Sequence, residues 1–158
     1  MNDTNTNNGS DGNNDSRKSG YFDLHVQGIG YVNRIRTVKV KKGYAFLACS
    51  ISALRGDADD AEYTTFDVRV SGTDAQEIIK LLEADSNAKK AVVIGFKLGD
   101  IYAETFIYQK DTQYHKKGDV GVMIKGRLLK VTFAKVDGKT VDLSGYNQPK
   151  QAADGTNG

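Results

Sequence analysis

Five segments of this chain have the character of β-strands, and the alternation of apolar and polar residues with a period of two in the first three of them limits the fold more than any other feature. Successive side chains of a β-strand point to opposite faces of a sheet, so the pattern predicts strands that are buried on one face. The five segments are residues 22–40, 44–54, 63–72, 90–108 and 121–136. We therefore expect an all-β protein.

The first segment changes its inward parity along its length. Gly28 and Gly30 lie close together, and Ile35 is out of step with Val38 and Val40. A strand whose inward parity shifts is bent or bulged. A bend or bulge is therefore predicted in the first strand.

The next two segments keep a regular alternation. Their predicted inward residues are Leu47, Cys49, Ile51, Phe66, Val68 and Val70. Cys49 is the only cysteine, which excludes an internal disulfide and favours a small buried apolar side chain.

Helical periodicity occurs once, in residues 73–84. Thr73 followed by Gln76 is typical of a capping box. The apolar stripe consists of Ala75, Ile78, Ile79 and Leu82. One short helix between strands 3 and 4 of five main strands is the plan of a five-stranded OB-fold, a Greek-key barrel.

Both ends of the chain are polar. Residues 1–20 consist almost entirely of Asn, Asp, Gly, Ser and Thr, and residues 147–158 have a similar composition. Such segments bury too little apolar surface to offset the entropy lost on ordering, so we expect disordered tails. The OB-fold domain is predicted to span residues 21–146, a usual domain size.

Positive charge is concentrated rather than abundant. Residues 21–146 carry 19 basic and 16 acidic residues, a net charge of +3, which is too small to indicate a nucleic-acid binder by itself. Residues 30–56, however, hold six basic residues and no acidic one, placed between aromatic and β-branched residues.

Enzyme and cofactor motifs are weak. Gly28 and Gly30 have the spacing of a dinucleotide fingerprint, but no third glycine opens a helix after them. His25 and His115 lie 90 positions apart and form no zinc spacing with the single cysteine. One loop contains four acidic residues, Asp57, Asp59, Asp60 and Glu62. We interpret it as a solvated loop, and a divalent metal site is the alternative. We predict no enzyme, no cofactor and no metal site.

Several stretches resemble a known family. VQGIGYVNRIRTV followed by GYAFLACSISA resembles the first two strands of bacterial single-stranded-DNA-binding proteins, and EYTTFDVRVSG and VVIGFKLGDIYAETF are similar to their third and fourth strands. The resemblance implies that Tyr63 and Tyr102 stack on bases. The stretch from Phe22 to Leu143 also resembles replication proteins encoded by integrative conjugative elements.

A single-stranded nucleic acid exposes phosphates and unstacked bases, so its binders combine cations with flat rings. The candidate rings are Tyr31, Tyr44, Phe46, Tyr63 and Tyr102. The candidate cations are Arg34, Arg36, Lys39, Lys41, Lys42, Arg55, Arg69, Lys97 and Arg127. The alternative is an ordinary polar strand surface with lysines that protect sheet edges.

These observations predict a protein that binds single-stranded DNA without strong sequence preference, in replication or in the transfer of a mobile element. Two alternatives stay open, an OB-fold adaptor that docks replication proteins and a metal-dependent nuclease. The longest apolar run, AVVIGF, is far shorter than the roughly 20 residues of a membrane helix. We expect a cytoplasmic bacterial protein without membrane contact, and the family resemblance implies a homo-oligomer, a dimer or a tetramer.

Overall fold

The computed structural model describes residues 20–146. Apart from Gly20, the two predicted tails, residues 1–20 and 147–158, lie outside the described residues. The predicted domain boundaries therefore stay a prediction.

The described part is mostly β-sheet with one α-helix. Its five long strands are β1 (His25–Val38), β2 (Phe46–Arg55), β3 (Glu62–Val70), β4 (Val92–Ile107) and β5 (Val120–Val136). A two-residue strand, β6 (Lys139–Thr140), follows a turn at Asp137 and Gly138, where both residues have positive φ. The helix α1 (Thr73–Asn87) lies between β3 and β4, as expected.

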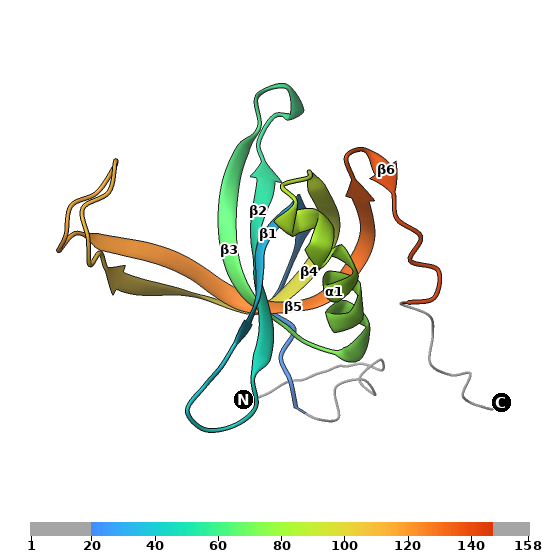
Figure 1. Cartoon of the computed structure of the whole chain (residues 1–158), viewed down its shortest axis with the longest axis horizontal. Helices are drawn as coiled ribbons and strands as arrows, with labels where there is room; N and C mark the ends of the chain where they lie inside the picture. The colour runs from blue at the N-terminus through green and yellow to red at the C-terminus, as the bar shows by residue number, and fades with distance from the viewer. Residues whose placement is uncertain (1–19, 147–158) are drawn as a thin grey trace, which may run out of the picture.

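The sheet closes on itself. Its order is β3-β2-β1-β4-β5-β6, and a parallel pairing of β3 with β5 joins the two sides into a ring, while all other pairs are antiparallel. Figure 1 shows the strands curving around a centre with α1 packed beside them. The architecture is that of an OB-like barrel.

The predicted irregularity in the first strand is confirmed. The register between β1 and β2 shifts between Asn33 and Arg36, and Arg34 there has a φ of 51°. The extra residue lets Val32 and Ile35 both face the core. The expected start of the strand at Phe22 is wrong, because β1 begins at His25. Phe22 lies before the strand and is 91% exposed.

The core forms where the alternation and the helical stripe predict it. All six predicted inward residues of β2 and β3 are buried, and so are the four residues of the α1 stripe. The predicted capping box is wrong. The N-cap is Gly72 without a side-chain cap, and the Gln76 N–H donates to the Gly72 carbonyl at 3.0 Å. Thr73 already lies inside the helix, so its hydroxyl is not at the cap position.

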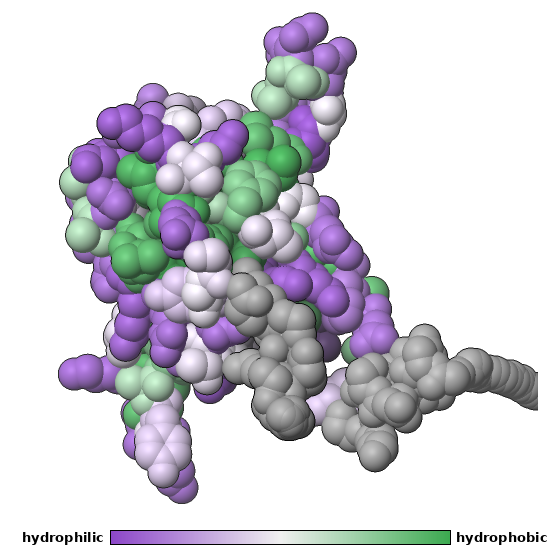
Figure 2. Space-filling view, turned by 90° about the vertical axis from the view of Figure 1, so that its right-hand side faces the viewer, coloured by the Kyte–Doolittle hydropathy of each residue, from purple (hydrophilic) through white to green (hydrophobic). Residues whose placement is uncertain are grey.

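Three connections extend from the barrel. The β1–β2 loop and the β2–β3 loop, which contains the short 3-10 helix η3 (Ala58–Asp60), project in opposite directions (Figure 1). The outer halves of β4 and β5 form a two-stranded ribbon that leaves the barrel on a third side. On the face shown in Figure 2, hydrophobic side chains gather between hydrophilic ones.

Candidate nucleic-acid interface

Pairing across the closed sheet places outward side chains from different strands in two rows. Residues directly opposite on neighbouring strands lie side by side, about 4.8 Å apart. The first row consists of Arg36, Ala48, Arg69 and Arg127. The second row consists of Asn33, Ser50, Asp67, Lys125 and Tyr102. Three arginines from three strands are thus brought within a span of roughly 14 Å.

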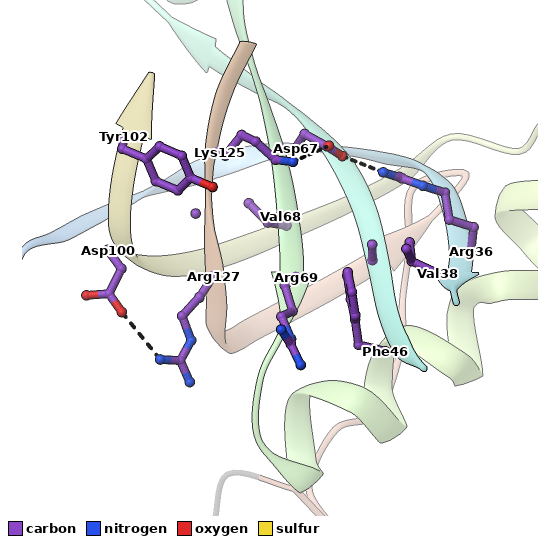
Figure 3. Close-up of a pocket in the computed structure, with 12 residues that line it drawn as sticks. Arg36, Val38, Phe46, Asp67, Val68, Arg69, Asp100, Tyr102, Lys125 and Arg127 are labelled. Atoms are coloured by element: carbon purple, nitrogen blue, oxygen red, sulfur yellow. Dashed lines mark hydrogen bonds and ion pairs between the residues drawn. The ribbon is translucent and has the colours of Figure 1, made fainter. Parts of the chain in front are cut away.

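A groove of about 600 Å³ lies over these rows (Figure 3). Ala48 is only 3% exposed, and its small side chain leaves room between the larger ones. The groove is lined by Arg36, Val38, Phe46, Ala48, Asp67, Val68, Arg69, Asp100, Tyr102, Lys125, Gly126 and Arg127. Four of these residues are cationic and two are acidic, so the groove has a net positive charge.

Carboxylates contact three of the four cations. Arg36 donates to Asp67 at 2.7 Å, and the Lys125 ammonium lies 4.0 Å from the other oxygen of the same carboxylate. Arg127 donates to Asp100 at 3.3 Å. These contacts join four strands and place a carboxylate beside each of these three groove cations (Figure 3).

The fourth cation stacks on a ring. The Arg69 guanidinium lies over Phe46, with its carbon 4.2 Å from the ring centroid. Among the described residues, no carboxylate pairs with Arg69. Tyr102, 56% exposed, supplies a second ring at the other end of the groove. The groove therefore combines cations with two aromatic rings, of which Tyr102 is exposed.

The sequence matches a family model over residues 15–153, and that family is described as "Protein of unknown function (DUF3577)". This chain belongs to the DUF3577 family. No curated protein matches its sequence. A solved structure that resembles this DUF3577 chain is the "Crystal structure of a small single-stranded DNA binding protein from Mycoplasma pneumoniae", with 16% identity and a TM-score of 0.35 over 68% of this chain and 90% of that chain.

The structure brings five of the predicted site residues into the groove of the DUF3577 chain. These are Arg36, Phe46, Arg69, Tyr102 and Arg127. Tyr31 and Tyr63 lie farther along β1 and β3, with ring centroids 6.2 Å apart. Arg34 donates to the Ser50 hydroxyl at 3.2 Å.

Four predicted residues lie in and beside the β1–β2 loop instead. Lys39, Lys41, Lys42 and Tyr44 are all exposed, and Tyr44 is 92% exposed. They adjoin the groove through Val38 and Phe46, the residues at the two ends of the loop.

Two predicted cations lie away from the groove. Arg55 ends β2 and pairs with Glu62 at 2.7 Å. Lys97 lies on β4 between Gln27 of β1 and Lys130 of β5, on the side of the barrel away from β2 and β3. The Lys97 side chain points away from the core, as its role as a candidate cation requires. It faces a different side of the barrel from the groove, however, because β4 lies between β1 and β5.

Sequence reasoning missed Lys125, Asp67 and Asp100 as groove residues. Lys125 lies two positions before Arg127 and so shares its face of the strand, a signal that was present in the sequence. Asp67 and Asp100 gave no such signal, because each contacts a cation that another strand supplies.

Cys49 lies behind the groove in the core. It is fully buried, as predicted, and burial raises the pKa of its thiol to about 12. In the acidic loop, Asp57 accepts a hydrogen bond from the Asp59 N–H at 2.8 Å.

Residues 20–146 contain no cluster of three or more His, Cys, Asp or Glu side chains that would hold a metal ion. None of their helices has the length and apolar character needed to cross a membrane.

Proposed function

We propose that this protein binds single-stranded DNA, largely independently of sequence, through the groove over β1, β2, β3, β4 and β5. The observation that carries the proposal is the arrangement of Arg69 on Phe46, with Arg127, Lys125 and Tyr102 beside it. A single strand offers phosphates to such cations and base faces to such rings. Every base has a π-face, so stacking of this kind carries little sequence preference.

The proposed contacts extend beyond the groove at both ends. The β1–β2 loop adds exposed charges and a ring through Lys41, Lys42 and Tyr44. At the other end, the Tyr31–Tyr63 pair offers further stacking surface on the same strands. Arg55 and Lys97 are left out of the proposed path, because neither adjoins the groove.

We also propose that residues 21–146 form one five-stranded Greek-key OB-fold domain and that the protein assembles as a homo-oligomer. A role in replication or in the transfer of a mobile element follows from the family resemblance of the sequence, and binding to exposed single strands suits both processes. Light scattering at micromolar concentration tests the assembly, and a monomer there contradicts it.

The deciding experiment is a fluorescence anisotropy titration of labelled oligo-dT with the full chain. Duplex DNA and RNA of the same length serve as competitors. Affinity should fall with added salt, with a logarithmic slope of about 0.7 for each phosphate contact. The proposal fails if oligo-dT binds no more tightly than duplex DNA at moderate salt.

A second candidate, an adaptor that docks another replication protein, is favoured by the ribbon of β4 and β5. Ile107 lies opposite Val120 and Thr105 opposite Val122, so the apolar side chains of Ile107, Val120 and Val122 share one face. Val120 and Val122 are 63% and 67% exposed. Replacing Val122 with Lys separates the two functions, because it disrupts an apolar docking surface but lies outside the groove.

A further inference from the structure

The cations of the groove are held by two different kinds of carboxylate. Asp67 lies at the centre, and its side chain is only 13% exposed while it accepts from Arg36 at 2.7 Å. Asp100 and Glu104 lie at the edge, and their side chains are 56% and 53% exposed.

The contacts of the two edge carboxylates are longer than the 2.7 Å contact of Asp67 with Arg36, although the second contact of Asp67, with the Lys125 ammonium, is 4.0 Å. Asp100 lies 3.3 Å from Arg127, and Glu104 lies 3.8 Å from the Lys125 ammonium. Exposed pairs of this kind contribute little stability, since water solvates both partners when they separate. Separating Asp67 from Arg36 costs more, because its largely buried charge would lose its partner.

We propose that Asp100 and Glu104 are built-in competitors for phosphate, which occupy Arg127 and Lys125 in the free protein and are displaced when a strand binds. Asp67, whose side chain is largely buried, stays in place and positions Arg36. This inference rests on the proposed function and assigns the two edge acids the role of limiting affinity.

Arg127 is suited to such an exchange. Its Nε donates to the Ser71 hydroxyl at 3.0 Å, while a different nitrogen, Nη1, contacts Asp100. The bond to Ser71 keeps the guanidinium oriented when Asp100 leaves, so a phosphate meets a cation that is already directed toward the groove.

The exchange has a consequence for salt dependence. A strand that binds to cations releases its own counterions, with a slope of about 0.7 per phosphate. A carboxylate that loses its cation partner at the same time attracts a cation from solution, which offsets part of this release. The wild-type slope should therefore be shallower than the number of phosphate contacts implies.

The test compares Asp100→Asn, Glu104→Gln and the matched control Asp85→Asn in the full chain. Asp100 has a φ of 55°, a conformation that Asn adopts readily, so its substitution keeps the backbone. Asp85 lies on α1 outside the groove and pairs with Lys90 at 3.2 Å, and its substitution changes the net charge equally.

Each variant is titrated with labelled oligo-dT over a range of salt concentrations. We expect Asp100→Asn and Glu104→Gln to bind about two- to fivefold more tightly than Asp85→Asn at low salt, the range that exposed ion pairs allow. Their slopes should be steeper by at most about 0.7. If both edge variants match Asp85→Asn in affinity and slope while the wild type binds oligo-dT, the inference is overturned and the proposed function stands. If the wild type does not bind oligo-dT, both fall.

Discussion

Arg69 lies over the ring of Phe46, with its guanidinium carbon 4.2 Å from the ring centroid. The contact joins β3 to β2 at the groove and is favoured by the electrostatic attraction between a cation and a ring face. A planar guanidinium also stacks on bases, so the pair presents a flat surface and a positive charge at one point. The proposed function depends on this combination of a flat surface and a positive charge.

Replacing Tyr102 with Leu tests the contribution of rings. We expect affinity for oligo-dT to fall by about 1 to 3 kcal/mol, because one stacked base is lost. The salt slope should stay nearly unchanged, since stacking releases few ions. Tyr114→Leu is the control, since Tyr114 is 81% exposed but lies in the ribbon loop outside the groove. Equal losses from both substitutions would contradict a specific role for Tyr102.

Replacing Arg69 with Gln tests the contribution of charge. The salt slope should decrease by about 0.7, because one phosphate contact is lost, and binding should weaken. Arg55→Gln removes the same charge outside the groove and should leave the slope unchanged. Anisotropy titrations at several salt concentrations measure both values. An unchanged slope for Arg69→Gln would remove Arg69 from the proposed site.

Two neighbouring leucines of α1 test the packing of the helix. Leu82 is 1% exposed and Leu81 is 51% exposed. Leu82→Ala should lower the free energy of unfolding by about 2 to 5 kcal/mol, because it leaves a cavity in the core. Leu81→Ala should change it by no more than about 0.5 kcal/mol. Urea denaturation measures both, and similar values would show that α1 packs on a different face.

The buried thiol of Cys49 gives a pH dependence. Burial raises its pKa from 9.0 to about 12, and the nearby Arg36 lowers it in part. The unfolded chain ionises the thiol first, so the stability that the neutral thiol provides is constant below pH 9 and is lost as the pH rises from 9 to about 12.

Comparison with Cys49→Ala isolates this effect from the titration of other groups. The difference in unfolding free energy between the wild type and the variant should shrink by about 1.4 kcal/mol between pH 8 and pH 10. Denaturation at each pH gives the two values. Parallel profiles of the two proteins would show that the thiol ionises equally well when folded.

Much of the fold could be predicted from the sequence because its signals are local. The alternation in β2 and β3 and the stripe on α1 identify the buried residues, since each pattern depends only on the geometry of its own element. The shift of parity in β1 likewise indicated the irregularity near Arg34. The capping box failed because it depends on the residue at which the helix begins, and the N-cap is Gly72, one residue before Thr73.

The site was only partly predictable, for a physical reason. The alternation indicates that the side chains of Arg69, Lys97 and Arg127 point away from the core. A closed barrel has several outer sides, however, and the local pattern does not indicate which side each residue faces. The parallel pairing of β3 with β5 places Asp67 opposite Lys125 and Arg69 opposite Arg127. Those residues lie 58 positions apart in the chain, so ring closure alone decided that they share one groove. The sequence determined the strands, the helix and the buried face of each, whereas the tertiary structure decided which charges meet and which carboxylates hold them.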